Sequence, residues 1–256
     1  MQRKARTSVA AGITTVALGV LVVGVVGSVT DASRAPVCPL PTFGPGADYH
    51  PQIDPANFSP NVNNAYFPLT PGTTLVYTGT KDGGNALDLS VTTSRTAIID
   101  GVTTRVVEDR LYIDNVLSER TSDYFAQDSC GNVWYFGEDT AELDARGRVI
   151  STEGSFHAGV DGAQPGVVMQ AVPEVGREFR QEWYAGHAED QFHVVDLKAR
   201  VKVPFGSFHD ALRTEETTAL ESDVVDNKYY VLGVGEVKEI AVKGPTEVLT
   251  LVEVIS

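Results

Sequence analysis

The sequence lacks the short motifs that mark the common catalytic scaffolds. It contains no G-x-S-x-G nucleophile elbow, no H-E-x-x-H zinc-binding helix, no Walker phosphate loop and no dinucleotide-binding glycine motif. Serines are also few near histidines, so no spacing indicates a Ser-His-Asp triad. We therefore expect a protein that does not catalyse a reaction, although an active site assembled from residues far apart in the chain stays open.

Basic residues are scarce as well. The chain of 256 residues has 20 lysines and arginines against 34 aspartates and glutamates, which gives a formal net charge of -14. Such an excess of negative charge repels phosphate backbones and anionic lipid headgroups. We expect no nucleic-acid partner, and contact with a membrane only through the N-terminal segment.

Sustained helical periodicity is missing from the chain after its N-terminal segment. In that segment Arg3, Lys4 and Arg6 precede an apolar run from about residue 9 to residue 29, which small and polar residues follow. This order is typical of an export signal, and the run is also long enough for one membrane-spanning helix. Residues 1–36 are therefore either a signal peptide or a single-span anchor. The positive-inside rule then predicts an extracytoplasmic protein, either secreted or anchored to the outer face of the cytoplasmic membrane.

Only two cysteines are present, Cys38 and Cys130. An exported chain folds under oxidising conditions, where a pair of cysteines forms a disulfide by default. We expect Cys38 in the N-terminal extension to be bonded to Cys130 in the first hairpin. A nucleophilic role for Cys130 is the alternative, and it needs a histidine base that no spacing supplies.

The exported part changes character at about residue 71. Residues 37–71 are rich in proline, asparagine and glycine with interspersed aromatics, which predicts an irregular but ordered arm laid over the domain. Residues 72–256 contain runs rich in valine, isoleucine, threonine and tyrosine, separated by turn signals such as KDGGN, IDG and IDN. This pattern predicts a mainly β domain built as an antiparallel meander.

The spacing of glycines indicates that the meander is duplicated. Three glycines of the first half recur about 104 residues later: Gly72, Gly101 and Gly131 correspond to Gly176, Gly206 and Gly235. We predict halves over residues 72–138 and 176–256, with a hairpin and a glycine-rich loop over 139–175 between them. Because each half is too small to be stable alone, the two would share one core in a single curved sheet or a barrel.

Aromatic side chains in related strands are the candidates for ligand binding. They are Tyr124, Trp134, Trp183, Tyr184 and Tyr229, with Tyr135 and Tyr230 beside them. The concave face of a curved antiparallel sheet holds apolar molecules in many exported proteins, although core packing uses the same residue types. Asp109 interrupts an apolar stripe on its strand, and it becomes a functional candidate if it is buried.

A metal-binding module or a metal-dependent enzyme is the alternative function. On a strand, His187, Glu189 and His193 share one face because their separations are even, and His157 joins them if the glycine-rich loop folds over the sheet. Nitrogen and oxygen ligands of this kind suit a divalent metal. No other cofactor is expected.

Four stretches of the chain resemble those of an uncharacterised family of exported bacterial proteins. They are IDPANFSPNVNNAYFPLTPGTTLVY, GNVWYFGEDT, GVDGAQPGVVM and KYYVLGVGEVKE. The meander alone is similar to the half-barrel carriers of the cell envelope that handle lipoproteins, although those have helices in the concavity and this chain shows no such pattern. The leading hypothesis is an exported protein that binds an apolar small molecule or another envelope component. A structural module that contacts other envelope proteins is the third hypothesis.

Overall fold

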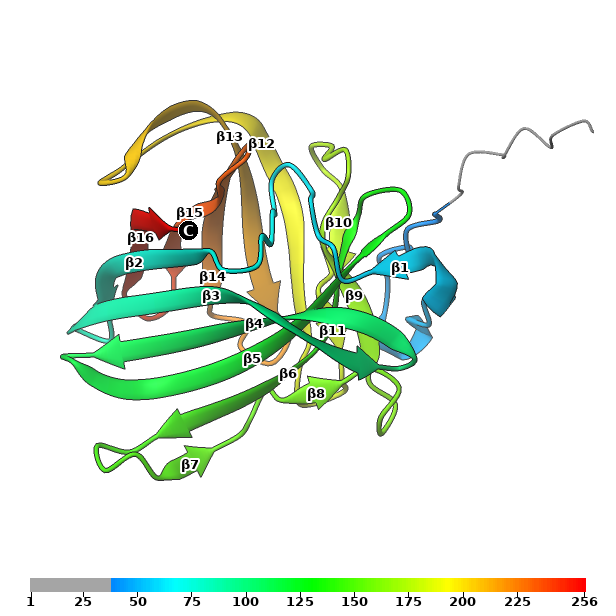
Figure 1. Cartoon of the computed structure of the whole chain (residues 1–256), viewed down its shortest axis with the longest axis horizontal. Helices are drawn as coiled ribbons and strands as arrows, with labels where there is room; N and C mark the ends of the chain where they lie inside the picture. Colours follow the sequence, from blue (N-terminus) through cyan, green and yellow to red (C-terminus); the bar gives the residue numbers. More distant parts are fainter. Residues whose placement is uncertain (1–37) are drawn as a thin grey trace, which may run out of the picture. The chain divides into compact units, whose positions relative to one another are not determined.

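The computed structural model describes residues 38–256, which form an almost entirely β-stranded domain (Figure 1). Within this range the only helical segments are two 3-10 turns, Gly46–Asp48 and Pro55–Asn57. No helix of the described part is long and apolar enough to cross a membrane. The signal peptide or anchor predicted for residues 1–36 lies outside the described residues.

The long strands coincide with the β-rich runs of the sequence, so the prediction of a mainly β domain is confirmed. In chain order they are β1 (Phe58–Ser59), β2 (Thr74–Lys81), β3 (Gly84–Ile99), β4 (Val102–Ile113), β5 (Val116–Asp128), β6 (Val133–Leu143), β7 (Val149–Ser151), β8 (Phe156–His157), β9 (Gln164–Met169), β10 (Glu178–Arg180), β11 (Glu182–Trp183), β12 (Asp190–Val203), β13 (Gly206–Thr218), β14 (Val225–Val231), β15 (Gly235–Lys243) and β16 (Glu247–Ile255).

The strands form one antiparallel sheet that nearly closes into a barrel. Its order is β10-β12-β13-β14-β15-β16-β2-β3-β4-β5-β6-β9-β11, and β1, β7 and β8 pair with β5 or β6 outside this order. The two ends of the order, β10 and β11, are separated in the chain only by Gln181, so they meet at one seam. A Cβ on Gly166 of β9 would lie 2.3 Å from the Arg180 carbonyl oxygen. Glycine therefore lets the backbones approach closely at the seam.

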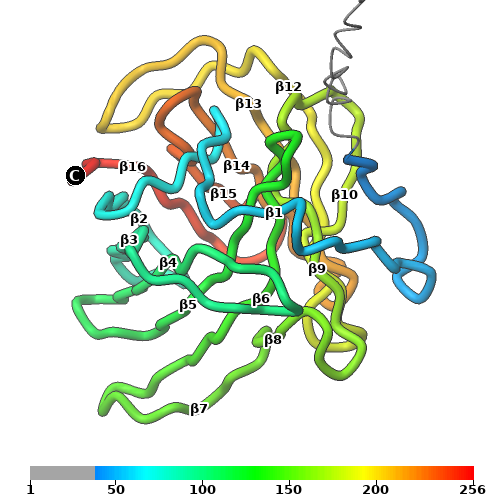
Figure 2. The backbone as a smooth tube through the Cα atoms, turned by 45° about the vertical axis from the view of Figure 1, so that its right-hand side comes forward, coloured from blue at the N-terminus to red at the C-terminus, as the bar shows by residue number. Residues whose placement is uncertain are grey.

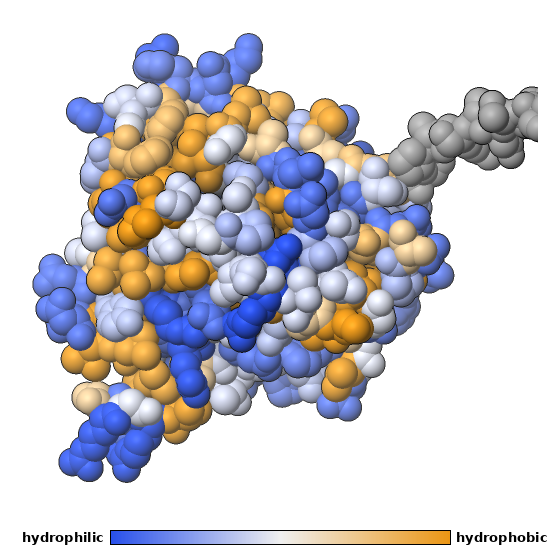
Figure 3. All heavy atoms as spheres, viewed as in Figure 1, coloured by the Kyte–Doolittle hydropathy of each residue, from blue (hydrophilic) through white to orange (hydrophobic). Residues whose placement is uncertain are grey.

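Two views show how the sheet curves around its interior. Strands β3–β6 lie on one side and β12–β14 on the other, and the long β12–β13 hairpin arches over the C-terminal strand (Figures 1 and 2). A backbone hydrogen bond of 3.1 Å from Phe205, at the hairpin tip, to Leu251 of β16 holds this arch. On the face shown in Figure 3, hydrophilic and hydrophobic side chains are interspersed in small groups, without one dominant apolar patch.

Two-residue turns connect the strands from β2 to β5. Asp82–Gly83, Asp100–Gly101 and Asp114–Asn115 have positive φ at both residues, between 47° and 82°. This is the geometry of type I′ turns, which matches the right-handed twist of the flanking strands and favours Asp, Asn and Gly. The turn signals in the sequence therefore predicted these hairpins correctly.

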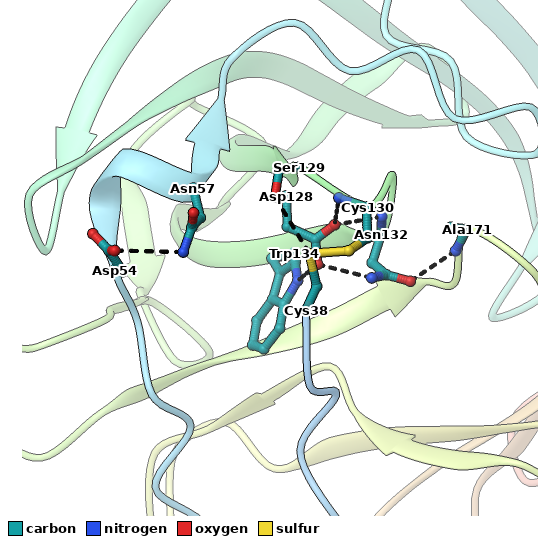
Figure 4. Close-up of a disulfide and its surroundings, with 9 residues drawn as sticks. All are labelled: Cys38, Asp54, Asn57, Asp128, Ser129, Cys130, Asn132, Trp134 and Ala171. Atoms are coloured by element: carbon teal, nitrogen blue, oxygen red, sulfur yellow. Dashed lines mark hydrogen bonds between the residues drawn. A yellow bond between two sulfur atoms is a disulfide. The ribbon is translucent and has the colours of Figure 1, made fainter. Parts of the chain in front are cut away.

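The arm before β2 is fixed to the sheet by a disulfide, shown in Figure 4, and by aromatic side chains. Cys38 is bonded to Cys130, which confirms the predicted pair. Phe58 packs edge-on against Trp134 and Phe136, with ring centroids 5.8 and 5.2 Å away. The arm therefore covers one opening of the sheet and completes its hydrophobic core.

A single carboxylate organises the turn that carries the disulfide. Asp128 accepts hydrogen bonds from the backbone N–H groups of Cys130 and Asn132, from the Asn132 side chain and from Trp134 Nε1. Asn132 in turn accepts a hydrogen bond from the backbone of Ala171 (Figure 4). Because Asp128 and Asn132 are buried, water does not reach their polar groups, and this network supplies the hydrogen-bond partners instead.

The hairpins β5–β6 and β14–β15 carry the same irregularity. The register shifts after Tyr124 in the first and after Tyr229 in the second, so that Phe136 and Val237 of the partner strands are skipped. Both skipped side chains are fully buried. The shared bulge fits a duplicated meander, and the duplication itself stays a prediction from the sequence.

Candidate functional site

The concave side of the sheet lines a partly open cavity of about 330 Å³, here called the inner cavity. Its walls come from strands β2–β6, β9 and β11–β15, and the arm closes one side. A volume of this size lies at the lower end of the range for small-molecule sites. The fold therefore places a partly open space of this size inside the curve of the sheet.

The lining of the inner cavity mixes apolar side chains with carboxyl groups. The apolar part is formed by Phe67, Leu69, Leu75, Val107, Phe125 and Val168, with the rings of Tyr77, Tyr135 and Tyr230. The carboxyl groups are those of Asp109, Asp123, Glu138, Glu182, Asp190, Glu216 and Glu236, and Lys228 is the one cationic side chain among the described residues that line the cavity. Seven carboxyl groups against one ammonium make this an acidic interior.

Strand pairing places two of these carboxyl groups directly opposite each other. Asp123 of β5 is the register partner of Glu138 of β6, and Asp123 accepts a hydrogen bond of 2.6 Å from the Tyr135 hydroxyl. Burial, reinforced by the charge of Asp109, raises the pKa of Asp123 to about 7. Burial and the charge of Asp123 raise the pKa of Glu138 well above its ordinary value. The pair therefore keeps a share of its protons near neutral pH and offers both hydrogen-bond donors and acceptors.

Lys228 is paired within the protein. Its ammonium lies 3.2 Å from Glu216 and 3.7 Å from Glu239. Burial disfavours the charge of Lys228, but the surrounding carboxylates outweigh burial and raise the pKa of the amine. Glu216 also accepts hydrogen bonds from Gln181, Thr214 and Tyr230. This ammonium is thus committed to Glu216 and Glu239.

A second space, the outer chamber, adjoins the inner cavity at Asp109, which lines both. Its volume is about 610 Å³, and nine carboxyl groups but only one ammonium, that of Lys81, line it in the described chain. Lys81 is paired with Glu247 at 3.2 Å. Asp109, which the sequence marked as a functional candidate if buried, therefore stands at the junction of two acidic spaces. Burial and the charge of Asp88 raise the pKa of Asp109 well above its ordinary value.

The five aromatic residues expected to bind a ligand lie elsewhere. None of them is among the described residues that line the inner cavity. Trp134 is 4% exposed and packs in the core beneath the arm, and the Tyr124 hydroxyl donates to Asp139 at the surface. The Arg180 guanidinium covers Trp183, Tyr184 stacks on His187, and Lys238 lies over Tyr229.

The aromatic side chains that do line the cavity are mostly sequence neighbours of the expected ones. Phe125 lines the cavity and its neighbour Tyr124 does not. In the same way Tyr135 lines it and Trp134 does not, and Tyr230 lines it and Tyr229 does not. Adjacent strand residues point to opposite faces, so a choice between neighbours is a choice between faces. Simple alternation holds along β5 and β14 and fails on their partner strands β6 and β15, where Phe136 and Val237 are skipped. The mixture of aromatic and acidic residues within each strand was the sequence signal that could have indicated which residues line the cavity.

Each of the four proposed metal ligands has a separate partner. His157 lies 3.2 Å from Asp139, His187 lies 3.2 Å from Glu153, His193 lies 3.8 Å from Glu215, and Glu189 accepts from the backbone of Gly186. In residues 38–256, three candidate ligand atoms lie within 4.8 Å of one another only at Cys38, Asp128 and Cys130, where both sulfurs belong to the disulfide. Metal binding by the histidine set stays a prediction from the sequence.

Comparison with known proteins adds two structural likenesses. The sequence matches no protein-family model and no curated protein. One similar solved structure is a Bacteroides fragilis protein described as exported, with a YMCC-like fold; it has 12% identity and a TM-score of 0.41, and the match covers 75% of this chain and 100% of that one. Another is a Parabacteroides distasonis protein described as a lipoprotein, with 9% identity, a TM-score of 0.40 and coverage of 75% and 99%. Similarity of this degree transfers neither function nor site residues to this chain.

Proposed function

We propose that this protein is an exported, non-enzymatic binding protein whose inner cavity holds a small amphipathic molecule without negative charge. The observation that carries the proposal is the mixed lining of the cavity, in which apolar side chains stand beside seven carboxyl groups. Enclosed apolar walls with a few polar groups are the usual form of a small-molecule site. The sequence led us to expect an apolar ligand, and the carboxyl groups of the lining indicate that this ligand also has a polar group facing them.

The charge of the lining selects the kind of polar group. Lys228 carries the one ammonium among the described residues that line the inner cavity, and it is paired with Glu216, so an anionic headgroup would meet carboxyl groups without a free cation. Burying an unpaired charge is costly, and burying it beside like charges costs more. A hydroxyl or an amine, by contrast, can donate hydrogen bonds to Asp123 or Glu236. Fatty acids are therefore poor candidates, and alcohols or amines with a short apolar chain are good ones.

Uptake of matched probes tests the proposal. Native mass spectrometry of residues 38–256 with decanol, decylamine and decanoate should show one molecule of decanol or decylamine bound and little decanoate. Ser90 of β3 lines the cavity, so Ser90→Phe should fill it and abolish uptake. Ser207→Phe makes the same change on an exposed position of β13 and should leave uptake intact. Preferential uptake of decanoate, or equal uptake by both variants, would refute the proposal.

Export is the second part of the proposal. It is supported by the disulfide, which is typical of oxidising compartments, and by the signal-like pattern of residues 1–36. Fusing these residues to alkaline phosphatase, which becomes active only outside the cytoplasm, should give an active enzyme. Sequencing the N-terminus of the mature protein then separates cleavage from anchoring. An inactive but stable fusion protein would contradict export.

A further inference from the structure

Another space, here called the side pocket, adjoins the inner cavity near the C-terminal strand. Its volume is about 230 Å³. Four residues line both spaces: Pro68, Leu69, Leu75 and Ser90. Leu75 and Ser90 are on the neighbouring strands β2 and β3, while the other two belong to the arm. The inner cavity and the side pocket therefore meet at these shared side chains.

Strand register continues the wall of the inner cavity into the side pocket. Val254 of β16 is directly opposite Leu75 of β2. Leu75 is in turn opposite Ser90 of β3, which is opposite Asp109 of β4. Directly opposed residues of antiparallel strands point to the same face of the sheet. This row of side chains therefore runs along one face, from a carboxyl group of the inner cavity to an apolar residue of the side pocket.

The side pocket differs from the inner cavity in its charge. No aspartate, glutamate, lysine, arginine or histidine side chain of the described residues lines it. The polar part of its wall is formed by serine and threonine side chains, and the apolar part by Pro68, Leu69, Leu75, Phe205, Val234 and Val254. Burying a charged group here would leave it without a partner of opposite charge, whereas an alkyl chain finds apolar contacts.

The inner cavity alone gives an apolar chain little room. Its volume lies at the lower end of the range for small-molecule sites, and seven carboxyl groups occupy part of its wall. An alkyl chain that stayed beside these groups would displace water from them without supplying a hydrogen bond. A chain that passes Leu75 into the side pocket instead buries its methylene groups against apolar atoms, which is favourable for each methylene that leaves water.

The tip of the β12–β13 hairpin, which arches over β16 in Figure 1, forms part of the side pocket. Phe205 at this tip lines the pocket, and its backbone N–H donates a hydrogen bond to the carbonyl oxygen of Leu251 on β16. The Phe205 side chain belongs to none of the hydrophobic clusters that form the core of residues 38–256. An aromatic ring that lines an uncharged pocket without packing into the core is well placed to contact a ligand.

We propose that the ligand of the inner cavity is a long-chain amphiphile whose alkyl chain extends past Leu75 into the side pocket. This inference rests on the proposed function and narrows the ligand class to alcohols or amines with a linear chain longer than the inner cavity alone can hold. The polar group stays beside the carboxyl groups of the inner cavity, and the chain end lies among Phe205, Val234 and Val254. In the described chain these three residues line the side pocket and not the inner cavity, so they limit the chain length that the protein accepts.

Titration calorimetry of residues 38–256 with octylamine, decylamine, dodecylamine and tetradecylamine, each below its micelle concentration, tests the proposal. Every methylene group that becomes buried should tighten binding about fourfold. Val254→Phe fills part of the side pocket, so this gain should end at a shorter chain than in the wild type, while octylamine binding stays unchanged. Ile255→Phe adds the same ring at the next position of β16, which points to the other face and lines neither space in the described structure. This control should behave like the wild type.

Two further measurements locate the chain end independently. Val234→Phe, at the turn before β15, fills the side pocket from another element and should shorten the accepted chain in the same way as Val254→Phe. Dodecylamine with a diazirine on its last carbon should label Phe205, Val234 or Val254 after illumination, as mapped by mass spectrometry of peptides. Labelling confined to β5 and β6 would place the chain end in the inner cavity and overturn the inference.

The outcomes distinguish this inference from the proposed function. If octylamine binds but the gain with chain length is the same in the wild type and in both side-pocket variants, the side pocket holds no chain, and the proposal for the inner cavity stands. If no amine of the series binds the wild type, both proposals fail. Unchanged octylamine binding together with a shorter accepted chain in Val254→Phe and Val234→Phe, but not in Ile255→Phe, is the expected result.

Discussion

The buried carboxyl groups predict that the folded protein loses stability as the pH rises through neutrality. Asp123 is the sharpest case, because its pKa is about 7 in the folded protein and 3.8 as the ordinary value. Between pH 5 and 7 the folded protein holds a proton on this carboxyl group that the unfolded chain has already released. A group whose pKa is raised by folding stabilises fully below its unfolded pKa, and this stabilisation is lost as the pH rises through the folded pKa.

The size of the effect follows from the width of that window. One pKa unit corresponds to about 1.36 kcal/mol, so Asp123 alone should reduce the free energy of unfolding by about 2 to 3 kcal/mol between pH 5 and 7. Burial also raises the pKa values of Glu138, Glu182 and Glu236, so their contributions have the same sign. The wild-type protein should therefore be more stable at pH 5 than at pH 7.5.

Urea unfolding with the disulfide intact measures this dependence. In Asp123→Asn the amide oxygen can still accept from the Tyr135 hydroxyl, so the variant should lose about 2 kcal/mol of the pH dependence and be more stable than wild type at pH 7.5. Asp210→Asn, on the surface of β13, corrects for the change in net charge and should keep the wild-type slope. If wild-type stability rises from pH 5 to 7.5, or if the two variants have the same slope, the carboxyl groups are not buried as described.

Three further predictions concern the parts that hold the interior in place. Replacing both Cys38 and Cys130 with serine should reduce the free energy of unfolding by about 4 to 5 kcal/mol, because the disulfide closes a loop with a sequence separation of 92; a reductant should then affect the wild type but not the variant in urea unfolding. Gly166→Ala should destabilise the barrel seam by about 1 to 3 kcal/mol because its Cβ would meet the backbone at Arg180, whereas Gly44→Ala, with open space around it, should be neutral in thermal unfolding. Asp128→Ala should cost about 3 kcal/mol and alter the fluorescence of Trp134, since it removes the carboxylate that accepts from the indole and from two backbone N–H groups; an effect no larger than that of the exposed Asp54→Ala would contradict this role.

The fold could be predicted from the sequence to the extent that its determinants are local. Asp-Gly and Asp-Asn at the turns require positive φ, and this requirement alone locates the hairpins at Asp82, Asp100 and Asp114. Two cysteines in an exported chain leave one intramolecular pairing, so the disulfide followed from counting. The identity of the cavity residues is not local in this sense. The bulges at Phe136 of β6 and Val237 of β15 change which residues of these two strands face inward, and the sequence around each aromatic pair allows either phase.

The distribution of charge shows most clearly what a composition leaves undetermined. A net charge of -14 is compatible with an acidic outer surface and a neutral core, and it does not predict that carboxyl groups face each other inside the sheet. That arrangement depends on which strands pair and in what register, as with Asp123 opposite Glu138. Such pairs weaken a sheet, and neutral side chains at the same positions would pack without repulsion. A domain that keeps Asp123 and Glu138 opposite each other lessens this repulsion by holding a proton, as the raised pKa values of both carboxyl groups indicate.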